Sequence, residues 1–214
     1  MMEAVFSLLA KGFLLFSNGI VLAPLLLVGF ITRGGFFINS PSFKGSVIWG
    51  NSILLVLLTM IFNALLKSLF LVPLNPSLGG EGYAFPSGHM QVAVVFYGTM
   101  FQAYSNLIFR KILLLIIAGI GYGLIQQGYH NIWDVLGAVV FGAATLSVFA
   151  KIIAFPSLQE NPSRMGLDLM LLAGIMVAGI AFRTGISPHI EKTFQGLIGF
   201  SFLWLGLSFY VWKR

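Results

Sequence analysis

Two short stretches of the chain combine residue types and spacing that are suited to acid–base or nucleophilic chemistry. The first is the stretch PSGH at residues 86–89, which ends in His89, and the second is His130 with Asp134 four residues later. An aspartate about one helical turn from a histidine can orient the imidazole ring. An oriented imidazole is a better base or nucleophile, so the spacing indicates that His130 and Asp134 act together.

Ser87 and Gly88 precede His89 at a point that is typical of a helix start. Ser87 is a natural N-cap, and Pro86 breaks the segment before it. The free backbone amides at such a start, together with the positive end of the helix dipole, favour an anion such as phosphate. The alternative is purely structural, in which Ser87 only caps the helix and His89 lies in the headgroup layer.

Lys67 lies inside an apolar run, close to the end that leads toward residues 86–89. Its ammonium group could neutralise a bound phosphate, or it could extend to the membrane interface as long side chains often do. Asp134 has a structural alternative too, since a carboxylate is favoured at the positive end of a helix dipole if Asn131 is the N-cap. Ionisable side chains close to lipid are costly and usually functional, so the coincidence of these groups favours the catalytic interpretation.

The elements that position these residues are expected to be membrane-spanning helices. Of the 214 residues, 58% are hydrophobic and 8% charged, and the mean hydropathy is +0.96. This composition excludes an ordinary soluble domain, in which roughly 25% of residues are charged. The sequence predicts an all-α fold, a polytopic transmembrane helix bundle of about six to seven spans, because seven apolar stretches approach the ~20 residues that cross a bilayer. They cover residues 12–32, 48–72, 87–106, 110–128, 131–153, 166–182 and 194–212.

The chain is expected to form a single transmembrane domain over residues 1–214. Its loops are short, and neither an internal repeat nor a low-complexity linker divides it. No basic cluster precedes the first apolar run, so this segment is expected to remain as the first helix instead of being cleaved as a signal. Cysteine is absent, which excludes disulfides, thiol nucleophiles and cysteine-bound metals. The net charge of +6 comes from scattered basic residues, a distribution that does not favour nucleic acid.

The distribution of basic residues predicts which side of the membrane holds the candidate site. Eight lysine and arginine residues fall on one side of the predicted spans and four on the other. The positive-inside rule makes the first side cytoplasmic, which puts residues 73–87, 128–133 and 183–193 on the other side. A plasma membrane or bacterial inner membrane location is expected. The cytoplasmic residues are Arg33, Lys44, Arg110, Lys111, Lys151, Arg164, Lys213 and Arg214, and the others are Lys11, Lys67, Arg183 and Lys192.

Around these residues the chain resembles the type 2 phosphatidic acid phosphatase superfamily. Its membrane members share three motifs, K-x6-R-P, P-S-G-H and S-R-x5-H-x3-D. The second motif is intact at residues 86–89, and the H-x3-D part of the third is intact from His130 to Asp134. The resemblance covers roughly residues 60–140, so the predicted spans over 166–212 would be additions to a family-like catalytic core.

This resemblance implies a metal-independent hydrolase that acts on a lipid phosphate or a polyprenyl diphosphate through a phosphohistidine. By position, His130 would attack phosphorus, and Asp134 would orient the ring of His130. His89 would protonate the departing oxygen. Such an enzyme needs no cofactor, and its partners are the lipid substrate and the bilayer. The phosphate oxygens would be held by Lys67, Ser87 and the amide of Gly88.

Two arginines of the family motifs are missing from this chain. With Lys67 as the lysine of the first motif, Leu74 stands in place of its arginine. Gly123 and Leu124 stand in place of the serine and arginine of the third motif. Leucine cannot replace the bidentate hydrogen bonds that arginine makes with phosphate. Candidates to compensate are the cations Arg183 and Lys192, in the predicted loop between the last two spans, and the neutral donors Asn75, Gln126 and Gln127.

Three other functions stay open. A phosphotransferase would pass the phosphoryl group from His130 to another lipid or a sugar, and a non-catalytic member would bind or transport anionic lipids. Two histidines and a carboxylate can also bind a metal, here through His89, His130 and Asp134. The intact histidines and aspartate favour catalysis, whereas the missing arginines favour the binding protein.

Overall fold

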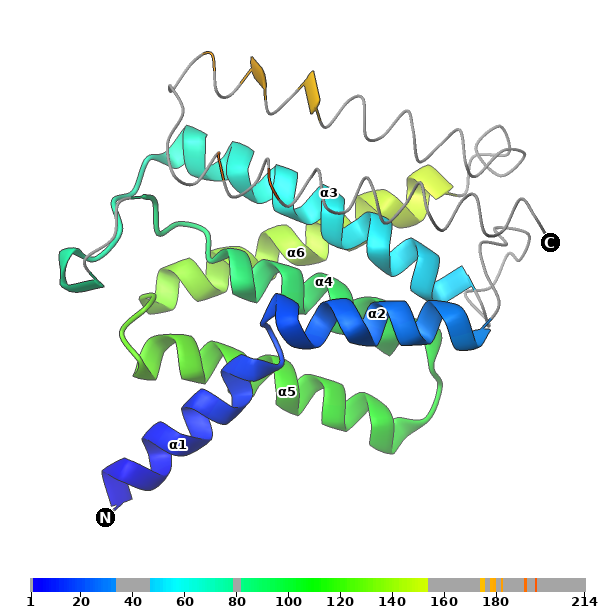
Figure 1. Cartoon of the computed structure of the whole chain (residues 1–214), viewed down its shortest axis with the longest axis horizontal. Helices are drawn as coiled ribbons and strands as arrows, with labels where there is room; N and C mark the ends of the chain where they lie inside the picture. The colour runs from blue at the N-terminus through cyan, green and yellow to red at the C-terminus, as the bar shows by residue number, and fades with distance from the viewer. Residues whose placement is uncertain are drawn as a thin grey trace.

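The computed structural model describes residues 2–33, 47–78 and 82–153, together with seven scattered positions between 174 and 195. In these residues it contains six α-helices and the short 3-10 helix η1 (Pro76–Leu78), and the only β contact among them is a bridge between Pro73 and Tyr83. The all-α prediction is confirmed for this part of the chain. The helices are α1 (Met2–Leu15), α2 (Gly19–Arg33), α3 (Val47–Phe70), α4 (Gly88–Ala103), α5 (Leu107–Gln126) and α6 (Ile132–Ile153) (Figure 1).

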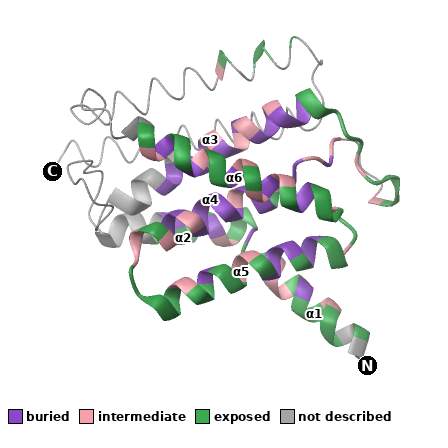
Figure 2. Cartoon of the chain, turned by 180° about the vertical axis from the view of Figure 1, so that it is seen from behind, coloured by how far each residue is buried: buried purple, intermediate pink, exposed green. Residues whose placement is uncertain are grey.

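Helix α4 lies inside the bundle, where it packs against α3, α5 and α6. Figure 2 shows the buried residues concentrated along α3 and α4. Small residues bring α6 close to α4, because a Cβ atom at Gly142 would lie 2.8 Å from a side-chain carbon of Val94. Close approach at small residues is a common way for membrane helices to associate. The start of α4 is therefore held against α3 and α6.

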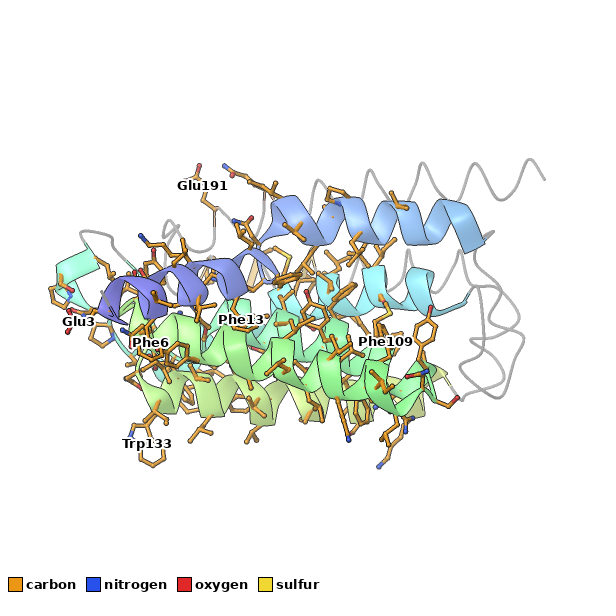
Figure 3. All side chains as sticks on the ribbon, turned by 90° about the horizontal axis from the view of Figure 1, so that it is seen from below. Glu3, Phe6, Phe13, Phe109, Trp133 and Glu191 are labelled. Carbon is orange, nitrogen blue, oxygen red and sulfur yellow. The ribbon has the colours of Figure 1, made fainter. Side chains whose placement is uncertain are left out.

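By length and composition, three stretches of the described residues could cross a membrane: Val5–Leu26, which includes the turn between α1 and α2, Leu107–Gln126 and Ile132–Lys151. Large apolar side chains on α5 and α6 are exposed, as side chains that face lipid would be. One of them is Trp133, whose ring points away from the helices in Figure 3. The predicted spans 48–72, 87–106, 110–128 and 131–153 correspond to α3, α4, α5 and α6.

The predicted first span, residues 12–32, is two helices and not one. Helix α1 begins at Met2, before the predicted start at residue 12, and the chain turns between α1 and α2 at residues 16–18. The side chain of Asn18 accepts a hydrogen bond from the amide of Ile20. A local bond of this kind competes with a continuous helix and starts a new one. Outside the described residues, apart from scattered helical positions, lie the predicted spans 166–182 and 194–212.

Several helix ends meet at the end of the bundle where the chain begins. They are the end of α3, the start of α4, the end of α5 and the start of α6 (Figure 1). Between α3 and α4 the chain doubles back, with the amide of Leu74 bonded to the carbonyl of Gly82 and the amide of Ala84 to that of Val72. The two histidine motifs therefore lie at one end of the molecule.

Candidate active site

His130 is positioned by the turn that ends α5. Gly128 has a φ of +71°, in the left-handed region that glycine adopts without strain. The amide of Tyr129 donates to the carbonyl of Leu124 and that of Gly128 to the carbonyl of Ile125, both at 3.0 Å, which are the paired bonds of a Schellman motif. The amide of His130 also donates to Leu124, at 3.2 Å. The backbone of His130 is therefore fixed to the end of α5.

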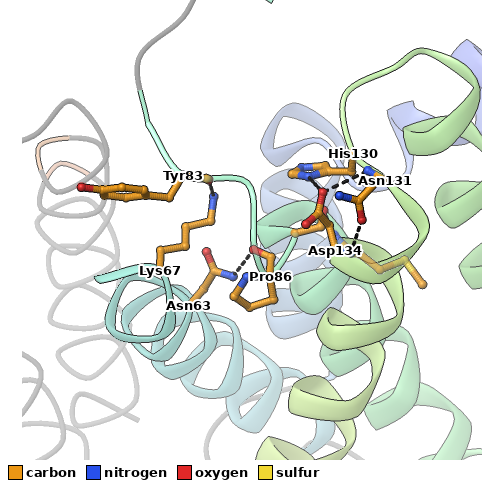
Figure 4. A network of polar contacts seen from close by, with 9 residues as sticks. Asn63, Lys67, Tyr83, Pro86, His130, Asn131 and Asp134 are labelled. Atoms are coloured by element: carbon orange, nitrogen blue, oxygen red, sulfur yellow. Dashed lines mark hydrogen bonds and ion pairs between the residues drawn. The ribbon is translucent and has the colours of Figure 1, made fainter. Parts of the chain in front are cut away.

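Asn131 and Asp134 cap the start of α6 and orient His130. The amide of Asn131 donates to Asp134 Oδ2 at 3.0 Å, and the amide of Asp134 donates to Asn131 Oδ1 at 2.9 Å, a reciprocal pair like a capping box. The same Oδ2 lies 3.4 Å from His130 Nδ1 (Figure 4). Asp134 is buried, with 2% of its surface exposed. When Nδ1 donates to this carboxylate, the lone pair of the neutral ring is on Nε2.

Ser87 caps the start of α4, as the sequence predicted. Its Oγ accepts from the amide of Met90 at 3.5 Å, and the residue is fully buried. The amide of Ser87 donates to the backbone carbonyl of Asp134 at 3.1 Å. This hydrogen bond joins the first residues of α4 to the first turn of α6, and thereby brings the two histidine motifs together.

Lys67 lies in the last turn of α3 with 5% of its surface exposed. Its Nζ donates to the carbonyl oxygen of Tyr83 at 2.6 Å, a contact that Figure 4 shows beside Pro86. The ammonium group is therefore turned inward, toward the segment that precedes α4. The contact uses one of its three protons and ties α3 to the segment that leads into α4.

The electrostatics of His130 connect the four titratable groups of the site. Burial lowers the pKa of His130 below its usual 6.5, and the positive charge of Lys67 lowers it further. Asp134 opposes this through its charge and its hydrogen bond, whereas His89 adds to the lowering. Of these groups, Asp134 is in direct contact with the His130 ring, at 3.4 Å. A lowered pKa favours the neutral form of His130, which has a free nitrogen lone pair.

The PAP2 superfamily model matches residues 48–156, just over half of the chain. The chain belongs to the PAP2 superfamily. The predicted resemblance is thereby confirmed, and PAP2 membership supports a phosphatase-type lipid function in general. No curated protein and no solved structure matches the chain.

Leu124 and Gly123 stand where the PAP2 motif has arginine and serine, and both lie at contacts of α5. Leu124 is 2% exposed, and its carbonyl oxygen holds the turn before His130. At Gly123 a Cβ atom would lie 2.7 Å from the backbone oxygen of Ala10, which is in α1. A side chain at this position would therefore displace α1.

The neutral donors predicted to compensate for the missing motif arginines are exposed or have other hydrogen-bond partners. Asn75 is exposed, and its Oδ1 accepts from the amide of Ser77 at 3.1 Å. Gln127 donates to the hydroxyl of Ser7 at 3.3 Å, and Gln126 is exposed at the end of α5. In the described part of the chain, none of the three side chains is hydrogen-bonded to the two histidine motifs. Outside the described residues lie Arg183 and Lys192.

Asn63 and Gln91 were not predicted, yet both are buried beside the PSGH turn. Asn63 Nδ2 donates to the carbonyl oxygen of Pro86 at 3.1 Å, as Figure 4 shows, and to Gln91 Oε1 at 2.9 Å. Each is a side-chain amide within an apolar helix, one turn from a predicted site residue, and this could have indicated them. Asn63 lies four residues before Lys67, and Gln91 lies four residues after Ser87. Polar side chains at such positions are rarely without a function.

The metal alternative gains no support from the geometry. Within residues 2–33, 47–78 and 82–153, no group of three histidine, aspartate or glutamate side chains could hold an ion. The Asp134 oxygen nearest to His130 already accepts from the amide of Asn131.

Proposed function

We propose that this protein is a membrane phosphatase that releases inorganic phosphate from a lipid phosphate or a polyprenyl diphosphate through a phosphohistidine. The observation that supports it most is the 3.1 Å hydrogen bond from the Ser87 amide to the Asp134 carbonyl. This bond places the start of α4, whose free amides suit an anion, beside the pair of His130 and Asp134. The PAP2 superfamily match supports the general class of reaction.

In the first step, Nε2 of His130 attacks phosphorus. Asp134 accepts from Nδ1 and stabilises the positive charge that the ring gains. The bond between phosphorus and the leaving oxygen breaks with its electron pair on that oxygen, and protonated His89 donates the proton that the oxygen takes up. The products are the dephosphorylated lipid and a phosphohistidine.

In the second step, water hydrolyses the phosphohistidine. His89 is now neutral and accepts a proton from the water as its oxygen attacks phosphorus. The bond between phosphorus and Nε2 of His130 breaks, and its electron pair returns to the ring. Inorganic phosphate leaves, His89 is protonated again, and His130 is neutral again.

The phosphate oxygens are held by groups at the end of α3 and the start of α4. Lys67 has two ammonium protons left after its bond to Tyr83. The Gly88 amide belongs to the first turn of α4, where amides have no partner within the helix. Together with the Ser87 hydroxyl, these donors stabilise charge where it develops in the transition state, usually the largest catalytic contribution. Arg183 adds a second cation, in place of a missing motif arginine.

We further infer a single domain over residues 1–214 with about six to seven spans, a catalytic core near 60–140 and the site on the non-cytoplasmic face of a plasma or bacterial inner membrane. The described helices support this orientation, because basic residues gather at the end of the bundle opposite to the histidines (Figure 1). Positive charge near span ends marks the cytoplasmic side. These residues are Arg110 and Lys111 at the start of α5 and Lys151 at the end of α6.

Phosphate release by the purified full-length protein, from a panel of lipid phosphates and diphosphates, tests this function. We expect turnover that persists in a chelator, is lost in His130→Ala and is retained in Tyr129→Phe, an exposed neighbour in the same turn. Loss of turnover in the chelator would indicate a metal enzyme. Turnover only with an added lipid or sugar acceptor would indicate a phosphotransferase. Lipid binding without turnover, unchanged in His130→Ala, would indicate a binding protein.

A further inference from the structure

The peptide group between Pro86 and Ser87 is held from both sides. Its carbonyl oxygen accepts from Asn63 Nδ2 on α3 at 3.1 Å, and its amide donates to the carbonyl oxygen of Asp134 on α6 at 3.1 Å. The carbonyl and the amide of one peptide bond lie in one plane. Two hydrogen bonds on opposite edges therefore fix the orientation of this plane, from which the Ser87 side chain and the first amides of α4 project.

The orientation of the Asn63 side chain is itself fixed. A carbonyl oxygen can only accept, so Asn63 must present its NH2 group to Pro86. The second proton of this NH2 group is donated to Gln91 Oε1 at 2.9 Å. Gln91 is fully buried, and its Nε2 has no partner in the part of the chain that the structure describes. An unpartnered buried donor is destabilising, which indicates that the pair serves more than the stability of the bundle.

The side chain of Asn63 also occupies the space beside the residue that starts α4. A Cβ atom at Gly88 would lie 3.1 Å from Asn63 Oδ1, closer than most side-chain contacts. The amide of Asn63 therefore bonds to Pro86 through its nitrogen, while its oxygen leaves little room for a larger residue at position 88. These residues flank Ser87 in the turn that supplies the phosphate donors.

We propose that Asn63, oriented by Gln91, is a positioning residue for phosphate binding. It holds the Pro86–Ser87 peptide group in the orientation that turns the Ser87 hydroxyl and the Gly88 amide toward the phosphoryl group. This inference rests on the proposed function, because it names what positions the turn that binds phosphate. Neither Asn63 nor Gln91 touches the reacting atoms.

The test compares neutral variants of similar size in the full-length protein. Asn63→Leu removes the bond to Pro86, and Gln91→Met removes only the partner that orients Asn63. The control is Thr59→Val, one turn earlier on α3, because Thr59 is also fully buried and its hydroxyl donates only to the carbonyl of Leu55 in its own helix. Orthovanadate, an analogue of phosphate, is the binding probe.

We expect Asn63→Leu to weaken orthovanadate binding by about tenfold or more, and Gln91→Met to weaken it less. In turnover, kcat should fall with little change in the KM for the lipid, because the positioned donors act mainly in the transition state. Thr59→Val should leave both quantities unchanged. A residue with only a structural role would lower the thermal midpoint without changing orthovanadate affinity. Asn63→Ala is measured in the same way if the leucine variant does not fold.

Equal orthovanadate affinities in the Asn63 variants and Thr59→Val would overturn the inference. A wild-type protein that binds orthovanadate but releases no phosphate would contradict the proposed function alone, and the comparison of affinities would still decide the role of Asn63. A wild-type protein that binds no orthovanadate would overturn both.

Discussion

The side chains of Asn131 and Asp134 each accept a hydrogen bond from the other residue's backbone amide, at 2.9 and 3.0 Å. The oxygen of Asp134 that does so also lies 3.4 Å from Nδ1 of His130. One carboxylate therefore caps α6 and is the partner of the proposed nucleophile. Substitutions can separate these functions, because the cap depends on Asn131 as well and the orientation of the histidine ring depends on Asp134.

Asp134→Asn is expected to lower kcat on the order of 10²-fold or more with little change in thermal stability. The new side chain keeps an oxygen that can cap α6, but it lacks the charge that stabilises the ring cation of His130. Phosphate release and thermal unfolding measure the two effects. Asn131→Ala is the matched control, because it should cost about 1 kcal/mol of stability through the lost cap and retain most of the activity. The reverse pattern would show that Asp134 only caps α6.

Activity is expected to decline in acid as His130 becomes protonated. The neutral ring attacks phosphorus, and burial together with the charge of Lys67 lowers the pKa of His130 below 6.5. The acid limb of kcat/KM should therefore lie below pH 6.5, and the rate should fall as the pH drops through the folded pKa. An acid limb above pH 6.5 would contradict this assignment. His130 also makes the free energy of unfolding depend on pH. Because its pKa is lower in the folded than in the unfolded protein, protonation favours the unfolded state, and stability decreases as the pH drops below 6.5.

Lys67→Met is expected to move this acid limb toward higher pH. Removing the ammonium group removes one cause of the lowered pKa of His130, whose value should then rise toward 6.5. The rate at neutral pH should also fall, since the phosphate loses a cation. The measurement is the pH profile of kcat/KM beside that of Lys111→Met, an exposed lysine at the opposite end of the bundle. Identical profiles for the two variants would exclude Lys67 from the site.

Gly137→Ala is expected to destabilise the protein by roughly 1 to 3 kcal/mol. A Cβ atom at Gly137 would lie 2.3 Å from the ring of Phe85, which packs edge-to-face against Phe70 with centroids 4.8 Å apart. The ring would have to move, and the adjoining Pro86 with it, so phosphate release should also decrease. Gly12→Ala is the control, because no atom lies within 4 Å of the added carbon and alanine favours the helix by up to about 1 kcal/mol. Unfolding midpoints in one detergent compare the two variants.

Arg183→Gln is expected to lower kcat/KM by about tenfold if its guanidinium replaces a motif arginine. The effect should diminish for a substrate analogue with fewer phosphate charges. Lys192→Gln is measured beside it, and Lys151→Gln at the far end of α6 is the control. Unchanged phosphate release in both Arg183→Gln and Lys192→Gln would contradict the hypothesis that these residues replace the missing motif arginines.

Local signals in the sequence predicted the helices that carry the candidate site. The starts of α4 and α6 lie within one residue of the prediction. Ser87 and Asn131 account for this accuracy, because a capping side chain acts on amides two or three residues away and its effect is visible in a short stretch. The break between α1 and α2 was not predicted, because the apolar residues on both sides of Ser17, Asn18 and Gly19 outweighed the turn signal of these three residues.

Contacts between distant residues could not be predicted. Asn63 and Gln91 are 28 residues apart, and the bond from Gln127 to Ser7 spans 120 residues. From the sequence alone, each of these side chains could bond to several other residues. Only the packing of the helices determines which partner it has. For the same reason, the sequence indicated Gln127 as a donor for phosphate, whereas the structure pairs it with α1.

Gly123 carries a consequence for the packing of α1 beside the site. The backbone oxygen of Ala10 lies 2.7 Å from the position that the first side-chain carbon of a serine at residue 123 would take, which is too close for an ordinary contact. The serine of the superfamily motif and the first helix of this chain therefore exclude each other. Restoring that serine in this chain would therefore require α1 to move away from the end of α5 that leads into His130.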